Sequence, residues 1–219
     1  GFTVATTFAS EPTTFYYNNT TYSPTNFQSI YAGFDVSMAY ALATSDNIYA
    51  VKTHLFLGCD KMVNTLKRFG FSGDIPAIPS LALGVKEVSV KELTEAYSIL
   101  ANSGKQVTPT IITKITNMND EVLYEAKPKT SRIADESDVY LLSEAMTSVF
   151  DDNMTYNIRP TGVSIKSMLT TKYAAKSGST DTDNWMVGYN PDIVVSVWSG
   201  YDNNKEIISS LDAKFGKYI

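Results

Sequence analysis

The chain has 219 residues, of which 43% are apolar and 19% charged, enough apolar side chains for one domain with a sizeable core. This composition excludes a disordered or fibrous protein, and the formal net charge of −5 has the wrong sign for binding nucleic acid. The single cysteine (Cys59) cannot form an internal disulfide, and the single histidine (His54) cannot by itself anchor a multi-histidine metal site, which narrows the catalytic options.

The first part of the chain predicts an irregular connection followed by two helices. Residues 1–34 show neither helical nor alternating periodicity and are rich in Thr, Tyr, Asn and Pro. Apolar residues then recur at helical spacing from Val36 to Ala43, and a second helical run covers Ile48 to Leu57. The polar sequence Thr44-Ser-Asp-Asn47 interrupts the two runs.

Two further helices carry capping signals. Asp60 is a plausible N-cap for a helix over Lys61–Phe69, and Gly70 follows where a left-handed residue often ends a helix. Ser89 and Glu92 have the spacing of a capping box, which predicts a helix that begins there and runs to about Asn102.

The rest of the chain predicts a hairpin, a helix, three strands and a final helix. The ranges are Pro109–Asn117 with Glu121–Glu125 for the hairpin, Asp135–Phe150 for the helix, Lys172–Ser177, Asn184–Tyr189 and Ile193–Tyr201 for the strands, and Lys205–Ile219 for the last helix. This order favours an α+β fold, an antiparallel β-sheet flanked by helices. We expect one domain over 1–219, made of the connection 1–34, a mainly helical part 35–150 with a small hairpin, and the strands and C-terminal helix of 172–219.

Ser45, Asp46 and Asn47 form the first candidate site. A hydroxyl and a carboxamide two residues apart at a rigid helix junction are suited to passing a proton and orienting an amide. The same three residue types are also the favoured N-caps of helices, and by pattern alone the capping interpretation is the stronger one.

The second candidate site is Lys176-Ser177-Gly178-Ser179, followed by Thr180, at the end of a predicted strand. A lysine beside two hydroxyls can hold a carboxylate, and glycine lets a ligand approach a backbone N–H that could serve an oxyanion. An ordinary polar strand end that leads into a turn is the alternative.

The two sites together, in this order, resemble the conserved sequence elements of a known family. S-x-x-K, S-D-N and K-T-G are the signature of serine β-lactamases and penicillin-binding proteins. Here Ser45-Asp46-Asn47 lies within ALATSDNIYAV, and Lys176-Ser177-Gly178 is followed by the sequence NWMVGY from Asn184 to Tyr189. These stretches resemble the transpeptidase domain of class A, bifunctional penicillin-binding proteins, with Ser177 in the place of the usual Thr.

This resemblance implies a D,D-transpeptidase that cross-links peptidoglycan stem peptides ending in D-Ala-D-Ala through a serine ester, and that β-lactam antibiotics acylate. It implies that Ser45 relays protons, that Asn47 holds the catalytic lysine and the substrate amide, and that Lys176 sets the local electrostatics. Substrate binding would fall to Ser177, Gly178, Ser179 and Thr180, and the resemblance implies no metal and no organic cofactor. Trp185 would line the groove, although a position on the face of the sheet is the simpler interpretation.

The family's nucleophilic Ser-x-x-Lys is absent from these 219 residues. We therefore expect the chain to be a fragment that is inactive alone, with an N-terminal remainder that carries Ser-x-x-Lys and perhaps a glycosyltransferase domain. The resemblance places the parent protein on the extracytoplasmic face of the bacterial cell membrane, anchored by a segment outside this chain. A class A β-lactamase and a non-catalytic penicillin-recognising sensor are the alternatives.

Overall fold

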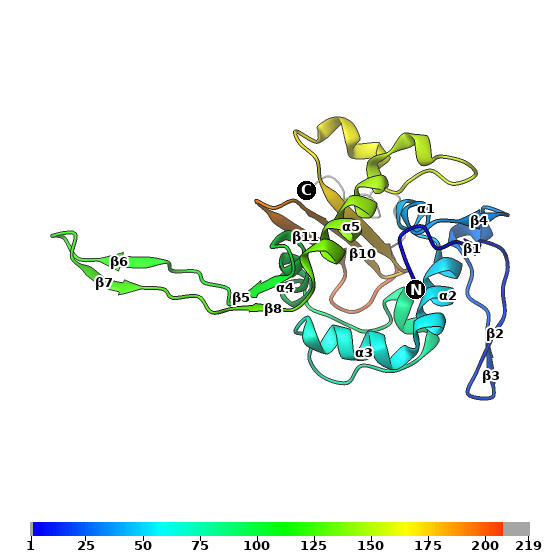
Figure 1. Cartoon of the computed structure of the whole chain (residues 1–219), viewed down its shortest axis with the longest axis horizontal. Helices are drawn as coiled ribbons and strands as arrows, with labels where there is room; N and C mark the ends of the chain where they lie inside the picture. The colour runs from blue at the N-terminus through cyan, green and yellow to red at the C-terminus, as the bar shows by residue number, and fades with distance from the viewer. Residues whose placement is uncertain (1, 208–219) are drawn as a thin grey trace.

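An antiparallel sheet of three strands lies at the centre of the fold. The computed structural model describes residues 2–207, and in it β9 (Ala174–Ser179), β10 (Asp183–Tyr189) and β11 (Val194–Gly200) pair in the order β11-β10-β9. The three predicted strands are confirmed, the first beginning at Ala174 rather than at Lys172. Together with the helices around this sheet they confirm the α+β class (Figure 1).

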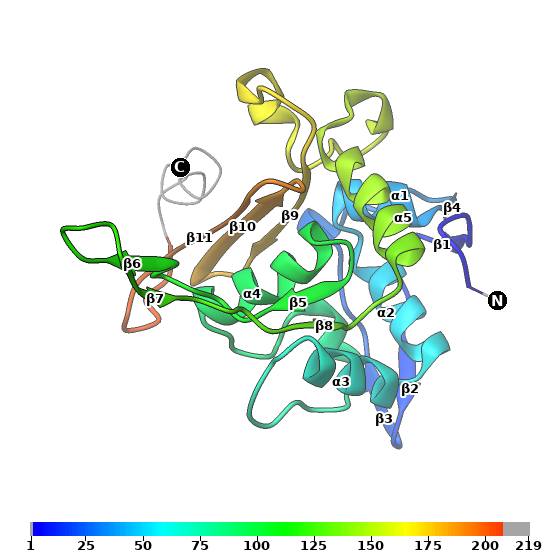
Figure 2. The same cartoon turned by 60° about the vertical axis from the view of Figure 1, so that its left-hand side comes forward.

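Two helices cover one face of the sheet. Helix α4 (Val90–Ala101) packs on β10 and β11, and α5 (Glu136–Thr147) packs on β9 (Figure 2). Tyr189 of β10 is buried between them, edge-on to Tyr97 of α4 and in contact with Met146 of α5. The contacts of Tyr189 hold α4 and α5 against the sheet whose strand β9 carries the second candidate site.

The opposite face of the sheet is also buried. Met186 of β10 packs with residues of two short 3-10 helices, η3 (Ser148–Phe150) and η5 (Val163–Met168). Helix α5 and η3 together correspond to the helix predicted over Asp135–Phe150. Because both faces are covered, the middle of β10 reads as a continuous apolar run rather than an alternating one.

Three α-helices lie between the N-terminal segment and α4 in the chain. They are α1 (Met38–Thr44), α2 (Asn47–Leu57) and α3 (Cys59–Arg68). The expected start at Val36 is wrong because Ser37 caps α1 and Val36 belongs to the short strand β4 (Asp35–Val36). The expected start of α3 is also wrong. Gly58, with a φ of 93°, ends α2, and α3 begins directly after it at Cys59, so Asp60 falls in the first turn.

The first 34 residues contain short elements that the sequence analysis did not predict. Strand β1 (Phe8–Ala9) pairs with β4, while β2 (Phe15–Tyr17) and β3 (Thr20–Tyr22) form a small hairpin before the 3-10 turn η1 (Phe27–Ser29). These elements have two or three residues each, too few to show a periodic pattern. The expectation of an irregular stretch is corrected at these points.

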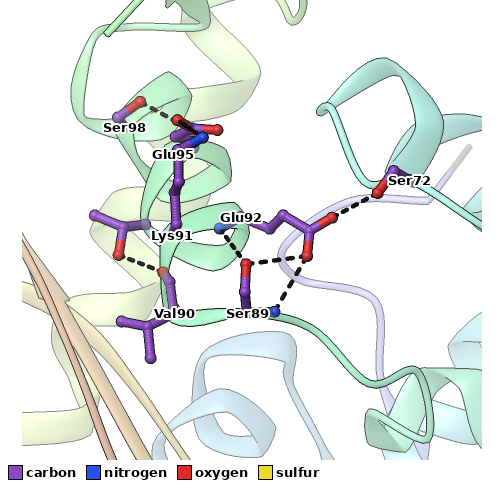
Figure 3. A network of polar contacts seen from close by, with 8 residues as sticks. Ser72, Ser89, Val90, Lys91, Glu92, Glu95 and Ser98 are labelled. Atoms are coloured by element: carbon purple, nitrogen blue, oxygen red, sulfur yellow. Dashed lines mark hydrogen bonds and ion pairs between the residues drawn. The ribbon is translucent and has the colours of Figure 1, made fainter. Parts of the chain in front are cut away.

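The capping box of α4 is confirmed. The Ser89 hydroxyl accepts a hydrogen bond from the Glu92 backbone N–H, while the Glu92 carboxylate accepts from the Ser89 N–H, each at 3.1 Å (Figure 3). Ser72 donates a further hydrogen bond to Glu92 at 2.8 Å. These bonds tie the loop before α4 to its first turn and fix where the helix begins.

A long β-arm projects away from the body (Figure 1). Its outer part is the predicted hairpin, with β6 (Lys114–Thr116) paired to β7 (Val122–Glu125). Its base is a second pair, β5 (Lys105–Val107) with β8 (Thr130–Arg132), which the sequence analysis did not predict. We define residues 105–132 as the arm.

The C-terminal helix predicted over Lys205–Ile219 is not seen in its first three residues, which are irregular. Its remaining positions lie outside the described residues. Within residues 2–207, none of the helices has the length and apolar character that crossing a bilayer requires.

Candidate functional site

Ser45 occupies a strained corner between α1 and α2. Its φ of 57° and ψ of 50° place it in the left-handed region, which a serine rarely adopts. The Ser45 N–H donates back to Leu42, and the Asp46 N–H donates to the carbonyl of Ala41 at 2.9 Å. The corner ends α1 and presents the Ser45 hydroxyl from a fixed backbone.

Asp46, next in the chain, caps α2. Its Oδ1 accepts a hydrogen bond from the Tyr49 N–H at 2.8 Å, so the capping interpretation is correct for this residue. Its Oδ2 accepts hydrogen bonds from the Ser10 hydroxyl and from the Asn26 amide, the latter at 2.8 Å. The carboxylate is buried and has three donors around it.

Lys176 of β9 connects the two candidate sites. Its Nζ donates to Ser45 Oγ at 2.6 Å and to the carbonyl of Ser177 at 2.6 Å. Ser45 and Lys176 are 131 residues apart in sequence, so tertiary packing alone brings them together. A hydroxyl beside a lysine ammonium is poised to accept and release a proton.

Helix α1 is held close to β9 through the end of α5. The Ser148 hydroxyl donates to the carbonyl of Ala39 in α1 at 2.8 Å, and α5 itself packs on β9. Ser148 is buried. This contact explains why Ser45, at the end of α1, lies opposite Lys176.

The register of β9 and β10 places Trp185 on the face of the sheet that carries Lys176. Gly178 lies directly opposite Trp185, and Lys176 lies opposite Val187. Residues that are paired in register, or two apart, share a face of the sheet. Gly178 is exposed and carries no side chain, so the backbone is accessible here.

Trp198 of β11 stands beside Trp185, with their ring centroids 6.5 Å apart. Its indole N–H donates to Asp183 at 2.8 Å. Hydrogen bonds from the Thr182 hydroxyl and then from this indole lower the pKa of Asp183, which keeps the carboxylate ionised at neutral pH. The end of the hairpin that carries the tryptophans is therefore anchored by a charged group.

The other predicted residues are arranged differently. Ser177 and Ser179 alternate with Lys176 and so fall on the other face of β9, with Ser179 exposed. Thr180 belongs to the turn between β9 and β10, where its N–H donates to the Asp183 carbonyl at 2.9 Å. Asn47 donates from its side chain to the carbonyl of Thr25 at 2.7 Å, and within residues 2–207 it makes no hydrogen bond to Ser45 or Lys176.

Ser10 and Asn26 are the residues at this site that sequence reasoning missed. Asn26 Oδ1 accepts from the backbone N–H groups of Asn47 at 2.9 Å and Ile48 at 3.4 Å, so it caps α2 from a distant segment. A polar residue in an aperiodic stretch gives no signal of such a role. His54 and Cys59 are buried, and neither takes part in the site.

Two hollows of the described surface lie away from Ser45 and Lys176. One of about 360 Å³ lies between α4 and the base of the arm and is lined by residues such as Thr94 and Pro109. Another of about 320 Å³ is lined by residues such as Phe150 and Lys166. Neither includes Ser45 or Lys176. Over the part of the chain described, no three His, Cys, Asp or Glu side chains are grouped as metal ligands would be.

Comparison with known proteins points to one family. Residues 2–214 match the family model described as the penicillin binding protein transpeptidase domain. The chain is 43% identical over 221 residues to penicillin-binding protein 2D of Bacillus subtilis, covering 100% of this chain and 32% of that protein. It is 28% identical over 209 residues to penicillin-binding protein 1A of Rickettsia prowazekii, covering 84% of this chain and 25% of that protein.

Solved structures share the fold. The structure of penicillin-binding protein 1A from Haemophilus influenzae aligns with a TM-score of 0.86 at 22% identity, over 96% of this chain and 36% of that one. A D,D-transpeptidase domain of a peptidoglycan glycosyltransferase from Eggerthella lenta aligns with a TM-score of 0.72 at 21% identity, over 98% and 58%. The chain thus spans about a third or less of the length of the two curated relatives named above.

Proposed function

Because this chain belongs to the penicillin-binding protein transpeptidase family, we propose that it is the part of a peptidoglycan D,D-transpeptidase that moves protons and holds the substrate. The observation that carries the proposal is the 2.6 Å hydrogen bond from Lys176 Nζ to Ser45 Oγ. It joins a hydroxyl and a cation from the two sequence elements that resemble the family's. The reaction is acyl transfer from a D-Ala-D-Ala stem peptide to an amine.

In this proposal the acyl carbon first bonds to a serine oxygen while the amide C–N bond of the terminal D-Ala breaks. The proton of that serine O–H passes through Ser45 to the leaving amine. In the second half-reaction the acceptor amine bonds to the acyl carbon, the ester C–O bond to the serine breaks, and a proton of the amine returns through Ser45 to the serine oxygen. The Lys176 ammonium holds the Ser45 hydroxyl in position and favours an anionic substrate end.

The remaining residues would bind substrate. Gly178 and Trp185 share the face of Lys176 and would line the groove, while the exposed N-terminal end of the turn at Ser179 and Thr180 would meet the terminal carboxylate. Ser177 lies on the other face of β9, but β9 is an edge strand of this sheet, so the Ser177 hydroxyl would reach the same carboxylate past that edge. Asn47 would turn from its contact with Thr25 to hold the substrate amide.

The nucleophile in this proposal comes from a Ser-x-x-Lys outside these 219 residues, in the parent protein. The B. subtilis relative is about three times longer than this chain, which supports a parent with further segments. We propose that these include a membrane anchor, which would hold the domain on the extracytoplasmic face, and a glycosyltransferase domain. β-Lactams would acylate the same serine.

Intact mass after exposure to benzylpenicillin tests the proposal. We expect the parent protein to gain one adduct on a serine outside residues 1–219, and this chain alone to gain none. An adduct on Ser45 would refute the assignment of that residue as a helper. Loss of the adduct within seconds would instead indicate a β-lactamase, and a stable adduct without cross-linking of stem peptides would indicate a sensor.

A further inference from the structure

Asp46 is a buried charged residue that the proposed chemistry does not use. Its exposed fraction is 3%, and those of its partners Ser10 and Asn26 are 0% and 3%. Burying a carboxylate is costly unless hydrogen-bond donors surround it. Asp46 has three donors, yet within residues 2–207 it has no ion pair to a Lys, Arg or His.

The two partners are themselves fixed by the backbone. The Ser10 N–H donates to the Phe34 carbonyl at 3.1 Å, and the Ser10 carbonyl accepts from Gly33 at 2.9 Å. The Ser10 hydroxyl also accepts from the Ala32 N–H at 3.2 Å. The cluster is therefore a rigid connection between the N-terminal segment and the first residues of α2, rather than a set of mobile side chains.

Further contacts attach the same segment to α2. The Tyr49 hydroxyl donates to the Thr6 carbonyl, and the Lys52 ammonium donates to the Ala9 carbonyl, both at 2.7 Å. All of these contacts are made by α2 or by its N-cap Asp46, which directly follows Ser45. The corner at Ser45 is thus bounded on one side by α1 and on the other by a helix end that the N-terminal segment holds.

A left-handed conformation of a non-glycine residue costs about 1–3 kcal/mol and persists only where the surroundings enforce it. Ser45 adopts this unfavourable conformation, and its hydroxyl accepts the hydrogen bond from Lys176. We propose that Ser10, Asn26 and Asp46 are positioning residues that enforce this corner, and so hold the proton-relaying hydroxyl in line for the reaction. The inference rests on the function proposed above.

The Asp46→Asn variant in the parent protein tests this. One carboxylate oxygen faces the Tyr49 N–H, and the other faces the Asn26 amide, whose orientation the Asn47 and Ile48 N–H groups fix. Either orientation of an Asn side chain would therefore point its NH₂ group at an existing donor. Ser10→Ala is a milder second variant, which removes one donor to the carboxylate.

The readout is the rate constant for acylation by benzylpenicillin, separated from the affinity of the initial complex. Misplacing a catalytic group by about 1 Å can cost roughly 100-fold in rate. We expect acylation to slow about tenfold in Asp46→Asn and by a smaller factor, still more than about twofold, in Ser10→Ala, with the affinity unchanged within about twofold, since the proton-relaying hydroxyl moves but the binding groove does not. Ser89→Ala, which removes a capping side chain far from Ser45, is the matched control.

The outcomes separate a positioning role from a structural one. The unfolding temperature of each variant is measured as well. The proposal is supported if Asp46→Asn or Ser10→Ala acylates slowly while Ser89→Ala, with a similar unfolding temperature, keeps its full rate. An unchanged rate overturns it, as does an equal loss of rate in Ser89→Ala. If Asp46→Asn fails to fold, Ser10→Ala alone decides.

Ser45→Ala in the same protein tests the underlying function separately. If this variant acylates and cross-links normally, the proposed relay is wrong. If it fails while Asp46→Asn and Ser10→Ala react at the full rate, the relay stands and only the positioning role is refuted.

Discussion

Replacing Lys176 by Met should remove the hydrogen bond that joins Ser45 to the second part of the proposed site. Met has a similar length and keeps the apolar stem, but it donates no hydrogen bond. The Ser45 hydroxyl and the Ser177 carbonyl then each lose a hydrogen bond of 2.6 Å from the Lys176 ammonium. The side chain is only half-buried, so the fold has less dependence on it than the site does.

A hydrogen bond that involves a charged group contributes about 1.5–3 kcal/mol, which corresponds to roughly 10- to 150-fold in rate if the contact acts in the transition state. We expect β-lactam acylation of the parent protein to slow by that factor, measured with a fluorescent penicillin in a stopped-flow instrument. Lys172→Met is the matched control, because Lys172 pairs with Glu144 at 2.6 Å on the exposed side of α5.

Two results would refute this reasoning. Acylation of Lys176→Met within twofold of the unsubstituted rate would mean that the Ser45–Lys176 contact has no part in the reaction. Equal slowing in Lys172→Met would mean that the loss comes from net charge or stability and not from the contact with Ser45.

Three more predictions concern the fold. Hydrogen bonds, first from the Ser89 N–H and then from the Ser72 hydroxyl, lower the pKa of Glu92 from 4.5 to about 2, so its stabilising effect should be complete above pH 4.5 and lost as the pH falls toward 2. Chemical unfolding should show that the unsubstituted protein has a higher free energy of unfolding than Glu92→Gln, and that this difference shrinks as the pH falls over this range. A difference that stays constant with pH would contradict the prediction. Ile48→Ala should lower the free energy of unfolding by about 2–5 kcal/mol, because Ile48 is 0% exposed, and a loss under 1 kcal/mol would contradict the packing around α2. Replacing residues 111–126 of the arm by a short turn should change that free energy by about 0.5 kcal/mol or less, since Ile111 and Met118 are fully exposed; a large drop in calorimetry would show that the arm supports the body.

The sequence predicted best those elements whose signals are local. The capping box at Ser89 and Glu92 fixed the start of α4, and the three strands of the sheet were found within two residues of their observed starts. The base of the arm was missed because β5 and β8 pair across the whole hairpin, and each has only three residues. Such pairing depends on tertiary contacts and leaves no periodic pattern.

The candidate site was predictable only in part, for the same physical reason. Two short motifs indicated Ser45 and Lys176, and the structure brings them into contact. Neither motif indicates Ser10 or Asn26, because their partners lie in another segment and the need for them arises only once Asp46 is buried. The structure also gives Asn47 a contact with the Thr25 carbonyl that the motif does not suggest.

The geometry of the site follows from two separate supports. Ser148 ties α1 to the end of α5, and α5 lies on β9, so the distance between Ser45 and Lys176 is set by helix packing. The orientation of the Ser45 hydroxyl is set instead by the buried cluster around Asp46, which acts from the other side of the corner. Distance and orientation are thus controlled by different parts of the chain. The left-handed conformation of Ser45 persists because α1 on one side and the Asp46 cluster on the other both restrain the backbone.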